Sequence, residues 1–201
     1  MRLVIIGASG HGKVVADIAE KNGYDEIRFY DDNESIRSCG KWPVVGTIEK
    51  AMGTRDDVFI GIGDARIREM LMKNFTDCRF PVLIHPNAVV AADVEIGEGT
   101  VIMAGAVVNP GAKIGRGVIL NTCSSVDHDC VIGDFVHVSV GAHLSGTVVV
   151  GQRTWIAIGA IISNNITICP DCVIGAGAVV IRTIASPGIY VGVPAEYKAN
   201  R

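Results

Sequence analysis

The chain has 201 residues, of which 49% are hydrophobic and 19% are charged. This composition suits one large or two small folded domains and excludes a disordered chain, which would carry more charge and fewer apolar residues. The net charge is −3 and the basic residues are scattered, so we expect no nucleic-acid partner. No apolar run reaches the length of a membrane span and no secretory signal opens the sequence. We therefore expect a cytoplasmic protein whose cysteines are reduced.

Residues 1 to 80 alternate short apolar segments with helical patterns, which predicts a small parallel sheet with helices. The first strand is expected over Leu3–Ile6, followed by a glycine turn over 7–12 and a helix over 13–22. Gly23 follows that helix in the position that favours a left-handed residue. The apolar face of the helix is expected to comprise Val14, Val15, Ile18 and Ala19.

Two more strands and a second helix complete this predicted domain. The strands are expected over Ile27–Tyr30 and Val58–Ile62. Asp64 can cap a helix whose apolar face would comprise Ile67, Met70 and Leu71. The composition changes near residue 80, so we expect one domain over residues 1–80 and a second over 81–201.

A six-residue repeat dominates the second part of the sequence. Every sixth position from 84 to 180 holds Ile, Leu or Val without exception. These positions are Ile84, Val90, Ile96, Ile102, Val108, Ile114, Leu120, Val126, Ile132, Val138, Leu144, Val150, Ile156, Ile162, Ile168, Ile174 and Val180. A mostly small residue precedes each by two, and Gly97, Gly115, Gly133 and Gly151 follow at intervals of 18. Six residues therefore make one short strand and corner, and three such units make one coil of a triangular prism. In that prism we expect the aliphatic residue to fill the interior and the glycines to adopt conformations that other residues resist.

This pattern resembles the hexapeptide-repeat family, whose fold is a left-handed parallel β-helix. The handedness comes from that resemblance, since the spacing alone does not fix it. The fold class expected for the whole chain is therefore a small Rossmann-like α/β domain followed by an all-β left-handed helix. An uninterrupted prism of this kind implies a homotrimer by the same resemblance.

His128 is the only one of the five histidines in a locally polar run, with Asp127 and Asp129 on either side. A carboxylate near an imidazole raises its basicity and fixes its tautomer, as a general base near neutral pH requires. A solvated corner that merely faces water explains the same residues. The stretch from His128 to Ala142 resembles the active-site segment of sugar acetyltransferases, which include sialic acid O-acetyltransferases and bacillosamine-pathway N-acetyltransferases. The resemblance makes His128 the base and Asp129 its support, although Asp129 is shorter than the Glu that is common there.

Four further residues are expected at an acetyl-CoA site on the basis of the resemblance: His137, Gly146, Ile158 and Ala176. His137 lies half a coil from His128, so the two cannot share one face of a single prism. If they act together, one comes from a neighbouring subunit, although His137 also fits an ordinary surface histidine. Gly146 lies one coil after His128, where its amide is a candidate donor to a thioester oxyanion.

The predicted turn Gly7-Ala8-Ser9-Gly10-His11-Gly12 lies between strand and helix but lacks the glycine pattern of a dinucleotide site. Glycines for tight turns and Asp caps explain each of these segments separately. The turn, Asp31-Asp32 and Gly61–Asp64 would nevertheless meet at the carboxyl edge of the sheet, where ligands bind. Together they resemble the nucleotide-sugar domain of the bacillosamine-pathway N-acetyltransferases. By that resemblance, the residues in contact with a UDP-sugar are Ser9, Gly10, His11, Asp31, Asp32 and Gly63.

The cysteines favour no metal site, although Cys123 and Cys130 could in principle be acyl-transfer nucleophiles. Cys169 and Cys172 supply half of a zinc site, and Cys172 falls on the small inward position of the repeat, as Cys130 does. The tail over 191–195 resembles the family's closing segment beside the acyl-CoA, whereas Glu196 replaces the basic residue common there.

The function implied by these resemblances is transfer of an acetyl group from acetyl-CoA to a UDP-linked amino sugar, without a metal. The specific reaction expected converts UDP-4-amino-4,6-dideoxy-N-acetylglucosamine to UDP-N,N'-diacetylbacillosamine. Alternatives within this class are O-acetylation of a sialic acid and N-acetylation of another nucleotide-linked amino sugar. Two other classes stay open, a γ-class carbonic anhydrase, which needs zinc, and a non-catalytic nucleotide-sugar sensor.

Overall fold

The computed structural model describes residues 1–200, which form two compact units, Met1–His85 and residues 86–200. The first unit contains β1 (Arg2–Ile6), α1 (Gly10–Lys21), β2 (Glu26–Tyr30), β3 (Ser38–Cys39), β4 (Trp42–Gly46), α2 (Ile48–Ala51), β5 (Asp57–Ile60), α3 (Ala65–Asn74) and β6 (Leu83–Ile84). Its five-stranded sheet has the order β3-β4-β2-β1-β5, in which β4, β2, β1 and β5 are parallel. The predicted parallel sheet is confirmed.

Helix α1 begins three residues earlier than predicted. Ser9 is its N-cap residue, in extended backbone, and the Lys13 amide donates to the Ser9 carbonyl. Gly12 therefore lies inside the first turn, where a Cβ atom would come 2.2 Å from the Gly7 carbonyl oxygen. The prediction that Val14 belongs to the buried face was wrong, because Val14 is exposed while Val15, Ile18 and Ala19 are buried.

Helix α3 has the predicted cap but a different buried face. The Asp64 carboxylate accepts from the amides of Arg66 and Ile67, which confirms it as the N-cap. The prediction that Ile67 and Met70 are buried was wrong, since both are exposed. The helix instead turns Ala65, Arg68, Leu71 and Met72 inward.

The segment that contains β3, β4 and α2 was not predicted from the sequence. Strands β3 and β4 form an antiparallel hairpin, and β4 then pairs with β2 in parallel. Strand β4 contains Pro43, a residue that argues against a strand, and none of its residues is buried, so the short apolar run over 42–45 was not predicted as a strand. The predicted third strand also ends earlier, at Ile60 in β5.

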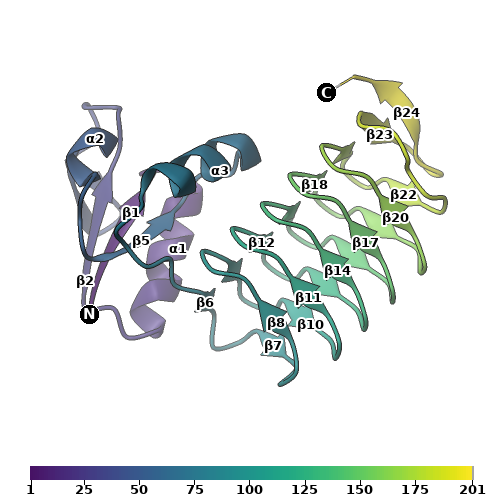
Figure 1. Ribbon diagram of the computed structural model, residues 1–201, viewed down its shortest axis with the longest axis horizontal. Coiled ribbons are helices and arrows are strands. Elements are labelled where there is room, and N and C mark those ends of the chain that lie inside the picture. Colours follow the sequence, from purple (N-terminus) through teal and green to yellow (C-terminus); the bar gives the residue numbers. More distant parts are fainter. Residues whose placement is uncertain (201) are drawn as a thin grey trace. The chain divides into compact units, whose positions relative to one another are not determined.

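The second unit is a three-sided prism of two-residue strands, each carrying one repeat position. These strands are β7 (Val89–Val90), β8 (Glu95–Ile96), β9 (Val101–Ile102), β10 (Val107–Val108), β11 (Lys113–Ile114), β12 (Ile119–Leu120), β13 (Ser125–Val126), β14 (Val131–Ile132), β15 (His137–Val138), β16 (His143–Leu144), β17 (Val149–Val150), β18 (Trp155–Ile156), β19 (Ile161–Ile162), β20 (Thr167–Ile168), β21 (Val173–Ile174) and β22 (Val179–Val180). Each strand pairs in parallel with the strand 18 residues away, for example Val108 with Val126. Figure 1 shows the coils following one another without an extruded loop. The tail adds β23 (Ile189–Val191), parallel to β21, and β24 (Glu196–Ala199), antiparallel to β23.

The predicted interior is confirmed from Ile102 onward, where every repeat position is buried, whereas Ile84, Val90 and Ile96 are half-buried. The reason given for the 18-residue glycines was wrong. Gly97, Gly115, Gly133 and Gly151 do not adopt the left-handed conformation. A Cβ atom at any of them would collide with the next coil, for example 2.7 Å from the Gln152 nitrogen at Gly133. The left-handed residues instead recur every six positions from Gly99 to Gly177, and half of them are not glycine.

Candidate active site

His128 lies at the corner between β13 and β14, with 57% of its side chain exposed. Its Nδ1 is 2.8 Å from Asp129 Oδ2, so the shorter carboxylate does reach the imidazole. Asp129 adopts a left-handed backbone with φ 58°, which turns its side chain back toward its neighbour. This hydrogen bond raises the pKa of His128, and the charge of Asp127 adds to the effect.

Asp127 holds the backbone of the same corner. Its Oδ1 accepts from the His128 amide at 2.8 Å and from Asn109 Nδ2 at 2.7 Å, one coil earlier. The bond from Asn109 is the main cause that lowers the pKa of Asp127, so this carboxylate stays charged. The corner that presents His128 is thus tied to the coil before it.

Gly146 lies against the imidazole from the following coil, as the 18-residue spacing predicts. The neighbouring Thr147 amide donates to the His128 carbonyl at 2.9 Å, which fixes the register of the two corners. A Cβ atom at position 146 would be 2.4 Å from His128 Nε2. Only glycine leaves room for the ring in this orientation.

His137 lies on a different sheet, in β15 between β12 and β18. Its ring stacks on Trp155 at 6.3 Å, and its Nε2 is 3.2 Å from Asn121 Nδ2. The topology therefore separates His137 from the His128 corner by one side of the prism. Asn121 and Trp155, which contact this histidine, were not predicted from the sequence.

Ile158 and Ala176 are exposed and lie one coil apart in the turns that follow β18 and β21. Val140 takes the same position one coil earlier and is exposed as well. These three residues form an apolar strip along one corner of the prism.

In the first unit, the predicted nucleotide segments gather at the carboxyl ends of β1, β2 and β5. The Ala8 amide donates to Asp31 Oδ2 at 2.7 Å, which joins the glycine turn to the end of β2. Asp31 Oδ1 also accepts from the Asn33 amide, and Asp32 Oδ1 accepts from the Ile48 amide. One oxygen of Asp32 thus supports the start of α2, while both oxygens of Asp31 support loops.

A buried arginine that was not predicted from the sequence lies behind these loops. Arg68 is 1% exposed and donates to the carbonyls of Ile62 and Gly63, at 3.1 and 2.7 Å. Burial, with a contribution from the Arg68 charge, lowers the pKa of His11 to about 4. His11 is therefore neutral at physiological pH. No signal in the sequence pointed to Arg68, because the apolar pattern of this helix placed Ile67 and Met70 on the inward face instead.

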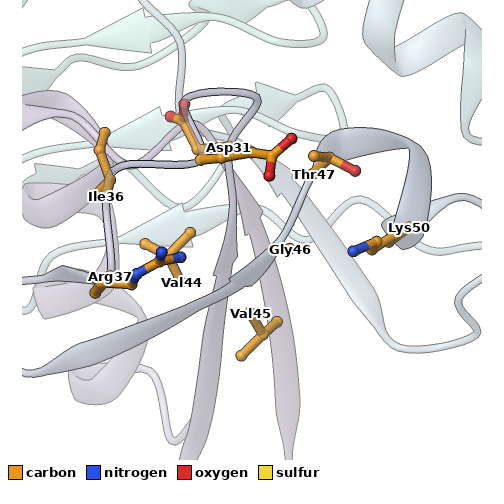
Figure 2. Close-up of a pocket in the computed structure, with 9 residues that line it drawn as sticks. Asp31, Ile36, Arg37, Val44, Val45, Gly46, Thr47 and Lys50 are labelled. Carbon is orange, nitrogen blue, oxygen red and sulfur yellow. The ribbon is translucent and has the colours of Figure 1, made fainter.

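A cavity of about 160 Å³ adjoins this edge of the sheet. Figure 2 shows the Arg37 guanidinium and the Lys50 ammonium approaching it from opposite sides. Of the predicted contact residues only Asp31 lines this cavity; its other lining residues are Glu34, Ile36, Val44, Val45, Gly46 and Thr47. The cavity arises from the missed segment, which is why no motif predicted it.

The six cysteines lie within residues 1–200 and differ in their exposure. Cys130 and Cys172 are buried, while Cys123 is exposed. The sulfur atoms of Cys169 and Cys172 lie 3.5 Å apart. In this part of the chain no group of three or more His, Cys, Asp or Glu side chains is arranged to hold a metal ion. No helix there is long and apolar enough to cross a membrane.

Comparisons with known proteins match both units. Residues 2–75 match the PglD N-terminal domain, and residues 81–110 match the bacterial transferase hexapeptide repeats. The structure of the acetyltransferase domain of PglB from Neisseria gonorrhoeae is 40% identical, with a TM-score of 0.95 over 98% of this chain and 99% of that one. A second structure of that domain holds acetyl coenzyme A. The prism is therefore the left-handed β-helix of hexapeptide-repeat proteins.

Two further relatives are named after nucleotide-linked sugars or were solved with one. PerB from Caulobacter crescentus, solved with CoA and GDP-perosamine, is 35% identical with a TM-score of 0.91 over 99% of this chain and 98% of that one. A UDP-N-acetylbacillosamine N-acetyltransferase from Bacillus subtilis is 36% identical over 112 residues. That match spans about half of each chain, 51% in both cases.

Proposed function

The chain belongs to the hexapeptide-repeat sugar acetyltransferases related to UDP-N-acetylbacillosamine N-acetyltransferase, and we propose that it acetylates a nucleotide-linked amino sugar with acetyl-CoA. The acceptor we propose is the 4-amino group of UDP-4-amino-4,6-dideoxy-N-acetylglucosamine, and the product is UDP-N,N'-diacetylbacillosamine. The observation that carries the proposal is the 2.8 Å contact between His128 Nδ1 and Asp129 on an exposed corner. It supplies the base that an attacking amine needs.

The reaction we propose is direct attack of the sugar amine on the thioester carbonyl. The protonated Nδ1 of His128 donates a hydrogen bond to Asp129, so that Nε2 is the basic nitrogen. As the carbon–nitrogen bond forms, Nε2 takes a proton from the amine, and the negative charge that develops on the carbonyl oxygen meets the Gly146 amide. The carbon–sulfur bond then breaks, and the imidazolium returns the proton to the CoA sulfur. No acyl-enzyme forms.

We assign the acetyl-CoA site to His137, Gly146, Ile158 and Ala176. The exposed strip that contains Ile158 and Ala176 offers an apolar surface for the acyl-CoA arm. His137 lies on another side of the prism from His128, so a site that uses both needs a neighbouring subunit. This arrangement favours a homotrimer with sites at its interfaces.

We assign the nucleotide-sugar site to Ser9, Gly10, His11, Asp31, Asp32 and Gly63. Neutral His11 can accept or donate one hydrogen bond without repelling a cation or attracting an anion. The cavity beside Asp31 is lined by the cations Arg37 and Lys50 and by the anion Glu34, so a diphosphate would lie on its cationic side, away from the carboxylates. The two aspartates are suited to hydroxyl or amine donors on the ligand, since they would repel phosphate.

Steady-state kinetics of His128→Ala and His143→Ala tests the assignment of the base. His143 is an exposed prism histidine hydrogen-bonded to Ser125, so its substitution controls for loss of a surface histidine. We expect His128→Ala to lower kcat by roughly 10²–10⁴-fold with little change in either KM, and His143→Ala to retain the parent rate. A His128→Ala enzyme with nearly full kcat, or an acetylated Cys123 trapped without acceptor, would contradict the mechanism.

A further inference from the structure

Gly111 occupies a left-handed position directly before Asp129 in one column of the prism. The column comprises Gly111, Asp129, Thr147 and Asn165, which are 18 residues apart and have φ values of 76°, 58°, 58° and 59°. Three of its four members have side chains, so the backbone conformation does not by itself require glycine at position 111. A reason other than backbone conformation must therefore explain why position 111 is glycine.

The carboxylate of Asp129 occupies the space that a side chain at position 111 would need. A Cβ atom on Gly111 would lie 2.5 Å from Asp129 Oδ1 and 3.4 Å from its Cγ. The other oxygen, Oδ2, bonds His128 Nδ1. The Asp129 amide donates to the Pro110 carbonyl at 3.1 Å, and the Gly111 amide donates to Asp93 Oδ2 at 2.9 Å, so the backbone on both sides of the contact is held.

The next two members of the column, Thr147 and Asn165, both have side chains, and these side chains contact each other. Thr147 Oγ1 contacts Asn165 Oδ1 in the following coil. A Cβ atom at position 111 would likewise meet the Asp129 side chain, but at 2.5 Å from Oδ1 it is too close to be accommodated unless the carboxylate moves.

We propose that Gly111 is a positioning residue whose missing side chain lets Asp129 turn toward His128. The catalytic consequence rests on the proposed role of His128, whereas the positioning itself does not. Among the described residues, the charged groups acting on His128 are Asp127 and Asp129. The coil before contributes the neutral Asn109 through Asp127, and the coil after contributes Gly146.

The test is an NMR titration of the His128 imidazole in the full-length protein and in the variants Gly111→Ala and Gly141→Ala. Gly141 is the matched control, because it also has a left-handed φ of 60° but has no atom within 4 Å of an added Cβ. We expect the pKa of His128 to fall toward about 6.5 in Gly111→Ala and to stay at the parent value in Gly141→Ala. An unchanged pKa in a folded Gly111→Ala protein would overturn the proposal. If the alanine variant does not fold, Gly111→Asn takes its place, since Asn165 adopts the same conformation in this column.

Kinetics separates this proposal from the assignment of the base. We expect Gly111→Ala to lower kcat by roughly 3- to 30-fold, a part of what a positioned base supplies, with both KM values retained. The same substitution in an Asp129→Asn background should have little further effect, because its partner is already lost. A lowered pKa with an unchanged kcat would support the positioning and contradict His128 as the base. Equal losses in the parent and Asp129→Asn backgrounds would contradict positioning through Asp129.

Discussion

Two histidines of this chain have pKa shifts of opposite sign for different physical reasons. His128 is exposed, and its hydrogen bond to Asp129 favours the protonated ring, which raises its pKa. His11 is buried, and desolvation favours the neutral ring, which lowers its pKa to about 4. The first therefore titrates in the range where a base is useful, and the second keeps one charge state.

Asp129→Asn should move the pH dependence of the reaction. The base acts when neutral, so the rate rises with pH through the pKa of His128, which Asp129 holds above its ordinary value of about 6.5. Without the carboxylate this pKa falls, and we expect the rising limb of kcat to move to lower pH while its plateau drops. A kcat–pH profile of both proteins measures this. If the rising limb of the profile lies at the same pH in both proteins, Asp129 does not set the basicity of His128.

At the scale of single residues, the sequence predicted the dyad but not the parts that hold it. His128 and Asp129 stood out because they share a short polar run. Asn109 and Gly111 act across coils, at a spacing of 18 residues, and their contacts depend on side-chain directions that periodicity does not contain. Arg68 was missed because its helix position fits an apolar residue equally well.

At the scale of elements, the glycines of the prism fall into two kinds. Some are needed because neighbouring coils approach them closely, and others because their backbone is left-handed. Gly133 is not left-handed, but an added Cβ would be 2.7 Å from the Gln152 nitrogen. Gly141 is left-handed and has open space around it. The structure thus assigns a different reason for glycine at each position.

Gly133→Ala should therefore destabilise the prism more than Gly141→Ala. We expect a loss of about 3 kcal/mol at Gly133 from overpacking against backbone, and of about 1 kcal/mol at Gly141 from the left-handed conformation. Urea unfolding followed by circular dichroism gives both values. Equal losses would show that the coils can separate enough to admit a methyl group.

The N-cap residues of α3 and α2 in the first unit allow a second comparison of two substitutions. Asp64 accepts two backbone amides at the start of α3, whereas Thr47 makes no side-chain cap bond at the start of α2. Asp64→Ala should cost about 1 kcal/mol and Thr47→Ala much less. Thermal unfolding of the two variants compares them, and a larger loss for Thr47→Ala would be inconsistent with the observed caps.

The prism elements were predictable because one residue type recurs every six positions and each recurrence buries a side chain. The first unit was harder to predict, because its hairpin of β3 and β4 contains Pro43 and lies at the edge of the sheet. Few side chains are buried there, so the sequence shows no alternation of buried and exposed residues that would mark the strands. The buried face of α3 also differed from the one that its apolar residues predict. Arg68 faces inward there, whereas Ile67 and Met70, which were expected to be buried, are exposed.

At the scale of the whole molecule, the two units carry different parts of the proposed chemistry. The nucleotide-sugar residues lie in Met1–His85, and the base and acetyl-CoA residues lie in residues 86–200. The two ligands should therefore respond to different substitutions. The half-coil separation of His128 and His137 also favours a trimer, and an active monomer in analytical ultracentrifugation would contradict that.

Asp32→Ala should weaken binding of the UDP-sugar and leave acetyl-CoA affinity nearly unchanged. Because Asp32 also accepts from the Ile48 amide, Asp32→Asn is the control that can keep this contact while removing the charge. Calorimetric titration with each ligand measures both affinities. Loss of acetyl-CoA binding in a folded Asp32→Ala protein would contradict the assignment of the two ligands to different units.

The most direct measurement is an acceptor screen with acetyl-CoA, in which free CoA and the mass of the sugar product are followed together. We predict rapid acetylation of the UDP-linked 4-amino sugar, slow or undetectable acetylation of the same sugar without UDP, and none of a sialic acid. Activity that persists with a strong chelator agrees with a reaction that needs no metal. Preferential acetylation of a hydroxyl on sialic acid, or equal rates with free and UDP-linked amino sugar, would contradict the proposed function.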